Sequence, residues 1–295
     1  ILLRWGALLM GWLSSGVYTE SKAELCRHIH ATWDQIQSRA QTIPVVLPKS
    51  LTLLGSSTKI KLTSEAFPEV LTRVIYMSPD SEAFQPESSR TMCPFASAEC
   101  SAACLGHNSG LLAMDDQKQA RIWKTALYVG ARELWRALLR FELAAFSRYC
   151  ESRGLQGAVR IDGSSDTGES LKHARDFGSL TFYDYHKVPT RSSDLVRLCY
   201  SFDGSEQSRE HAREVLQAGG NVAVVFDARP KSRSRAADQL PATWEGFPVF
   251  DGDVHDFLPA DPYGQVRGLH FKAARDRSGS LELAGSFVEP VEVST

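Results

Sequence analysis

The sequence predicts an α/β protein whose core is either a partial (βα)6 barrel or an open parallel sheet with its strands flanked by helices. Short apolar segments recur at intervals of about twenty to thirty residues, and amphipathic helical segments lie between them. Most of the strand candidates end in polar or acidic residues, as strands of such sheets do where they face a site. The length of 295 residues is sufficient for one large α/β domain.

The chain divides into three segments on this pattern. Residues 1–70 are expected to form an N-terminal helical extension, residues 71–275 the α/β core with a cysteine-rich loop, and residues 276–295 a C-terminal tail or edge strand. The first residues are apolar but too few to span a bilayer, and they are predicted to form a helix that packs on the body of the protein or on a partner. The alternative is a cleaved signal or a helix on a membrane surface. The N-terminal helices could therefore cover the open edge of the sheet or join two subunits.

The elements follow in order from Ser21, where the sequence SKAE forms a capping box and begins a helix. Residues 47–62 are rich in Ser and Thr and are predicted to form an edge hairpin. The first core strand is expected at Thr72–Asp80, and a long helical tract that Gly130 splits begins at Asp115. Further strand candidates begin at Gly157, Leu180, Leu195 and Asn221, and the segments FPVFDGDVHDF and VRGLHFKAA close the series as a sixth strand or a terminal hairpin.

Composition sets limits on function. The chain has 43% hydrophobic residues, 23% charged residues and a formal net charge of −2, so no basic excess points to nucleic acid. Its six cysteines are few and unevenly placed, which argues against a disulfide framework and for a reducing cytoplasm.

The segment MCPFASAECSAACLGH holds three of the six cysteines, Cys93, Cys100 and Cys104, close enough in sequence to converge on one metal. Three thiolates can hold three irons of a [4Fe-4S] cluster and leave the fourth iron open to a small molecule. Three thiolates and the imidazole of His107 would instead complete a zinc site. A third interpretation is that the cysteines are small apolar fillers.

Polar residues at the ends of the other strands are expected to face this loop, because the carboxyl ends of parallel strands lie at one edge of a sheet. Within DGDVHD, the alternation of a strand would place Asp251, Asp253 and His255 on one face, where they could bind a hard divalent metal in a hydrolase or nuclease. The strand-end residues are Asp162, Gly163, Asp166, Asp184, His186, Lys187, Ser201, Asp203, Asp227, Arg229, Asp251, Asp253, His255 and Asp256.

Several of these segments resemble a family of phage and prophage proteins known as the gene-product-eighty-eight family. The resemblance covers roughly Thr72 to Ala274 and implies no particular reaction, although a phage-encoded protein would act in the host cytoplasm. The matching stretches are MCPFASAECSAACL, AVRIDGSSD, LTFYDYHKVP, NVAVVFDARP, LPATWEGFPVFDGDVHD and VRGLHFKA.

The plan is also similar, more distantly, to that of radical S-adenosylmethionine enzymes, in which a three-cysteine loop follows the first strand of a partial barrel. This resemblance implies that Cys93, Cys100 and Cys104 bind the cluster. The spacing of these cysteines differs from the CxxxCxxC that is usual in those enzymes, because six and three residues separate them. It further implies that Asp162, Gly163, Ser164 and Ser165 hold the amino group of S-adenosylmethionine, that Asp184 and Ser201 assist them, and that the DGDVHD strand end and Lys272 face the substrate.

Three functions therefore compete. The first is an iron-sulfur enzyme that uses S-adenosylmethionine on an unknown substrate. The second is a zinc-stabilised phage accessory protein that binds nucleic acid or a host protein, and the third is the divalent-metal hydrolase or nuclease. A serine hydrolase or a P-loop enzyme is disfavoured, because the sequence has no GxSxG elbow and no Walker-type loop.

Overall fold

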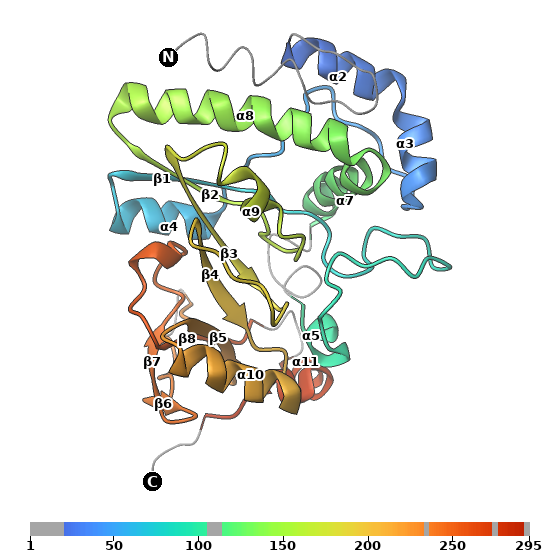
Figure 1. Ribbon diagram of the computed structural model, residues 1–295. Helices are drawn as coiled ribbons and strands as arrows, with labels where there is room; N and C mark the ends of the chain where they lie inside the picture. The colour runs from blue at the N-terminus through green and yellow to red at the C-terminus, as the bar shows by residue number, and fades with distance from the viewer. Residues whose placement is uncertain (1–20, 105–113, 233–235, 273–276, 292–295) are drawn as a thin grey trace.

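The computed structural model describes residues 21–104, 114–232, 236–272 and 277–291 (Figure 1). The predicted N-terminal apolar helix and His107 lie outside these residues. No helix within the described ranges is long and apolar enough to cross a membrane.

The core is a mixed α/β arrangement around a mostly parallel nine-stranded sheet, which is open and not closed into a barrel. Its strand order is β1-β2-β3-β4-β5-β8-β7-β6, and β9 pairs with β5 beyond the point where β4 has ended. All pairs are parallel except β6 with β7. The strands are β1 (Val70–Val74), β2 (Gln156–Arg160), β3 (Leu180–His186), β4 (Val196–Ser201), β5 (Asn221–Phe226), β6 (Thr243–Trp244), β7 (Phe247–Asp251), β8 (Val266–His270) and β9 (Val288–Glu289).

The helices follow the predicted pattern in most places. Ser21 caps the first of them by accepting a hydrogen bond from the Glu24 amide at 3.2 Å, as the capping box predicts. The helices are α2 (Lys22–Ala31), α3 (Trp33–Ala40), α4 (Thr58–Ala66), α5 (Ala98–Ala102), α7 (Asp115–Gly130), α8 (Arg132–Arg153), α9 (Glu169–His173), α10 (Glu206–Gln217) and α11 (Arg277–Ala284).

Gly130 ends α7 and separates it from α8, as the sequence predicts. A Cβ atom at this position would lie 2.2 Å from the backbone oxygen of Ile36. The missing side chain therefore lets α3 pack directly against the end of α7.

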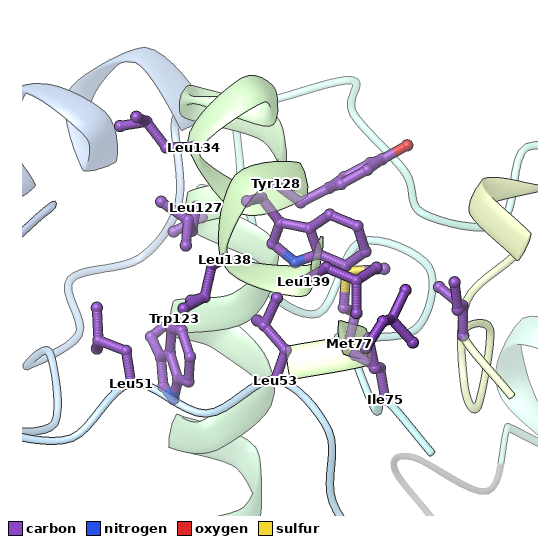
Figure 2. Close-up of a cluster of buried hydrophobic side chains, with 14 of the residues drawn as sticks. Leu51, Leu53, Ile75, Met77, Trp123, Leu127, Tyr128, Leu134, Leu138 and Leu139 are labelled. Atoms are coloured by element: carbon purple, nitrogen blue, oxygen red, sulfur yellow. The ribbon is translucent and has the colours of Figure 1, made fainter. Parts of the chain in front are cut away.

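One face of the sheet is covered by helices. Trp123 and Leu127 of α7 and Leu138 of α8 are almost completely buried in the largest hydrophobic cluster, together with Ile75 and Met77 from the segment after β1 (Figure 2). Helix α10 covers β4 and β5 on the same face, where Leu216 packs in a second cluster with Tyr200 and Val224. This layer fixes the sheet and so positions the strand ends.

The middle of the opposite face is covered by the segment that follows β7. Phe257 and Leu258 of this segment are buried against Tyr183, Cys199 and Ala223, which come from three neighbouring strands. The segment between β7 and β8 therefore crosses the face of the sheet opposite α7, α8 and α10.

Two expectations about local structure are wrong. The predicted edge hairpin at residues 47–62 is not formed, because Ser57 accepts a hydrogen bond from the Ile60 amide and caps α4. The alternative of a terminal hairpin also fails, because β7 and β8 pair in parallel, with β8 placed between β5 and β7.

Candidate functional site

The three cysteines of the loop after β1 line one open cavity of about 150 Å³ at the carboxyl ends of β2, β3 and β4. Arg160 at the end of β2, Lys187 after β3 and Ser201 at the end of β4 line the same cavity. The structure thus brings together side chains that are distant in sequence around Cys93, Cys100 and Cys104.

Hydrogen bonds attach the cysteine loop to the ends of two strands. The Asp166 amide donates to the carbonyl of Met92 at 3.0 Å, which joins the loop to the segment after β2. Ser97 caps α5 by accepting from the Cys100 amide at 3.0 Å, and its hydroxyl donates to the carbonyl of Asp203 at 2.7 Å. The positions of the thiols are therefore fixed by the sheet and not by the loop alone.

The thiols are partly buried. Burial raises the pKa of Cys93 to about 12 and also raises that of Cys100, while the positive charge of Lys187 opposes the rise at both. All six cysteines lie in described segments and none forms a disulfide. A metal that binds the three loop thiols would displace their protons.

Asp162, which the sequence assigns to cofactor binding, lines the cavity but uses its carboxylate within its own loop. One oxygen accepts from the Ser165 hydroxyl at 2.8 Å and from the Thr167 amide at 2.9 Å, and the other accepts from the Gly168 amide at 2.8 Å. Burial raises the pKa of Asp162, and these hydrogen bonds oppose the rise. The loop over residues 162–168, which we call the β2 loop, is thus organised around this side chain.

Gly163 also has a structural reason to be where it is. Its amide donates to the carbonyl of Ile75 at 3.0 Å, and a Cβ atom would lie 2.6 Å from that same oxygen. Only glycine lets the β2 loop approach the segment after β1 this closely.

Replacing Gly163 by alanine is expected to lower the free energy of unfolding by about 1–3 kcal/mol, because backbone must move to make room. Gly178→Ala is a matched control, since a Cβ atom there meets nothing within 4 Å. Urea denaturation of both variants measures the difference, and equal stability of the two would contradict the packing role of Gly163.

Of the other residues predicted to bind the cofactor, some line the thiol cavity and one does not. Ser164, Ser165 and Ser201 line the cavity, whereas Asp184 is not among the lining residues and is buried beneath the β2 loop, where it accepts from the Asp162 amide at 2.9 Å. The Ser164 hydroxyl donates to the carbonyl of Met77, and the Cys93 thiol lies 3.9 Å from the carbonyl of Ser164. The β2 loop therefore reaches the cavity mainly through backbone groups and small side chains.

Two cationic residues line the cavity, of which the sequence placed Lys187 among the strand-end residues that face the cysteine loop and did not single out Arg160. The Lys187 ammonium donates to the Ser201 hydroxyl at 2.7 Å. The Arg160 guanidinium contacts the carboxylate of Asp256 at 3.0 Å and lies over the ring of Tyr185 at 4.5 Å. Both cations come from strand ends. Their positions next to the DGSSD and YDYH segments are the feature of the sequence that indicates a place at the cavity.

The residues predicted for catalysis lie at the ends of β7 and β8, outside the lining of the thiol cavity. Asp251 and Asp253 approach His270, and their ligand atoms all lie within 4.8 Å of one another. Asp253 already contacts two cations, Lys272 at 2.8 Å and Lys59 at 3.4 Å. Burial opposes ionisation of Asp253, but the two lysines outweigh it and lower the pKa of this carboxyl.

His255 does not join Asp251 and Asp253 on one face of a strand. Strand β7 ends at Asp251, so the alternation on which the prediction relied stops there. The His255 Nδ1 atom instead accepts from the Phe257 amide at 3.2 Å, and its ring packs edge-on against Phe67. His270, from β8, takes the place that the sequence gave to His255.

The family model described as Gene product 88 matches residues 52–282 of the chain, which include the cysteine loop, the β2 loop and the ends of β7 and β8. Comparisons with curated proteins and with solved structures gave no match. The resemblance to radical S-adenosylmethionine enzymes therefore gains no support from these comparisons.

Proposed function

We propose that this chain, which belongs to the Gene product 88 family of phage proteins, is an iron-sulfur protein that binds a [4Fe-4S] cluster through Cys93, Cys100 and Cys104. The observation that carries the proposal is that these three thiols, all from one short loop, line a single cavity. Three protein thiolates leave one iron of such a cluster available to a small molecule.

The size of the cavity supports a cluster over a single zinc ion. Its volume of about 150 Å³ is several times that of one water, which is about 30 Å³ in the liquid. Among the described residues, the group of three potential ligands whose atoms lie within 4.8 Å of one another is Asp251, Asp253 and His270, and not the three thiols. Thiolates at bonds of about 2.3 Å to one zinc would lie closer together than this limit.

The cluster would supply one-electron chemistry to the molecule bound at its open iron. The chain itself would bind and orient that molecule. Because the Asp162 carboxylate is engaged by its own loop, the β2 loop would offer backbone groups to the ligand. Arg160 and Lys187 would supply positive charge from the ends of β2 and β3.

S-adenosylmethionine is the small molecule that we propose for the open iron. Support comes from the order of the parts, since the cysteine loop follows β1 and a polar loop that contains glycine follows β2 beside it. The reaction would be reductive cleavage of S-adenosylmethionine to act on a further substrate. Its test is consumption of S-adenosylmethionine by dithionite-reduced protein, with the variant that lacks all three loop cysteines as the control.

The identity of the metal is tested by metal analysis and an absorption spectrum of anaerobically purified protein. We expect about four irons per chain and thiolate-to-iron absorption at roughly 400 nm. One zinc per chain in a colourless preparation would replace this proposal with a structural zinc site. Cys26→Ala, which changes a thiol outside the cavity, should leave the spectrum unchanged.

A second candidate function rests on the group formed by Asp251, Asp253 and His270, whose spacing suits one hard divalent cation. Lys59 and Lys272 already balance the charge of Asp253, which makes this group a weaker fit for a cation. Magnesium- or manganese-dependent nuclease activity that survives loss of the three loop cysteines but disappears in His270→Ala would favour this candidate.

A further inference from the structure

Lys187 is a cation without a carboxylate partner at the thiol cavity. Its Nζ atom donates to the Ser201 hydroxyl at 2.7 Å and lies 5.9 Å from the centroid of the Phe287 ring. Across the part of the chain that the structure describes, no carboxylate lies within 4.0 Å of this ammonium. Lys187 is half-buried, and burial opposes its charge. Negative charge at the thiols of Cys100 and Cys93, followed by that of two nearby carboxylates, outweighs burial and raises the pKa of the ammonium.

Asp166 and Asp203, two acidic residues whose charge acts on Lys187, make their close contacts with other groups. Asp166 accepts from the Lys187 backbone amide at 2.8 Å and pairs with the guanidinium of Arg191. Asp203 accepts from the Ser205 amide at 2.8 Å. The ammonium of Lys187 is therefore held by a neutral hydroxyl, while the nearby carboxylates act on it only from beyond 4.0 Å.

Lys187 lines the same cavity as the three loop thiols. Once these are thiolates bound to iron, the group in the cavity carries net negative charge, and each added electron makes that charge larger. Net charge and hydrogen bonds to the sulfurs are among the factors that set the reduction potential of an iron-sulfur cluster.

We propose that Lys187 compensates the charge of the cluster, and that its ammonium, held in place by Ser201, stabilises the reduced form and raises the reduction potential. This inference rests on the proposed function, because it requires a cluster on the three cysteines. The inference gives Ser201 the role of orienting the ammonium and Lys187 the role of compensating the charge of the cluster.

The test is a redox titration, followed by electron paramagnetic resonance, of reconstituted wild-type protein and three variants. Lys187→Met is expected to shift the midpoint to a lower potential, and Lys187→Arg, which keeps the charge, to stay near the wild type. Lys172→Met is the matched control: it removes the same charge from an exposed lysine on α9 that pairs with Glu169 outside the cavity, and it should not shift the potential.

An unchanged potential in Lys187→Met, or an equal shift in Lys172→Met, would overturn the role of Lys187. If Lys187→Met retains no iron while Lys187→Arg does, the charge is required for the cluster to bind at all, which supports the inference. If both variants lose iron to the same extent, charge is not what Lys187 contributes. Absence of iron from the wild type would instead defeat the proposed function.

Discussion

Replacing Arg267 by methionine is expected to lower the free energy of unfolding by about 3–5 kcal/mol, because the change leaves a buried carboxylate without its counter-charge. Arg267 of β8 is completely buried, and its guanidinium donates to both oxygens of Asp261, at 2.5 and 2.6 Å. It also donates to the carbonyls of Gly252 and His255. Arg267 therefore ties the segment between β7 and β8 to the sheet.

The control for this prediction removes both charges. Arg267→Met combined with Asp261→Leu is expected to recover much of the lost stability, since no uncompensated charge then stays buried. Urea denaturation of the two single variants and the double variant gives the coupling between the two side chains. A loss below about 1 kcal/mol in Arg267→Met would be typical of an exposed pair and would contradict the buried position of this one.

Replacing Asp162 by alanine is expected to destabilise the β2 loop and with it the wall of the thiol cavity. The change leaves the amides of Thr167 and Gly168 without their acceptor. Each donor that water cannot reach lowers the free energy of unfolding by about 1–3 kcal/mol. Asp162→Asn keeps one acceptor oxygen and should lose less. We expect iron retention to fall in the same order as thermal stability, with alanine lowest.

A matched control is Asp176→Asn, which disrupts a half-exposed pair with Arg140 and should cost less than about 1 kcal/mol. The experiment also separates two roles of Asp162. If Asp162→Ala keeps full stability and iron but no longer binds S-adenosylmethionine, then the carboxylate contacts that molecule directly and does not serve the loop.

The order of strands along the chain could be predicted because short apolar segments between helices are a local signal. The common edge at which Asp162, Ser201 and the cysteine loop meet followed from the parallel direction of the strands. The split at Gly130 was equally local, because a glycine within a helical pattern marks a break or a close approach.

What could not be predicted depends on contacts between distant segments. The position of β8 between β5 and β7 is set by long-range pairing, and it is this pairing that brings His270 to Asp253 in place of His255. The sequence did not decide between an open sheet and a partial barrel, because the closure of a barrel depends on the curvature of the sheet.

The central claim is that the three loop cysteines together hold the cluster, and the iron content of two triple variants tests it most directly. We expect the triple variant in which Cys93, Cys100 and Cys104 are all replaced by alanine to lose essentially all iron and colour after anaerobic reconstitution. The second triple variant replaces by alanine the three cysteines outside the cavity, Cys26, Cys150 and Cys199, and it should keep about four irons per chain. Equal iron content in the two variants would contradict the assignment of the cluster to this cavity.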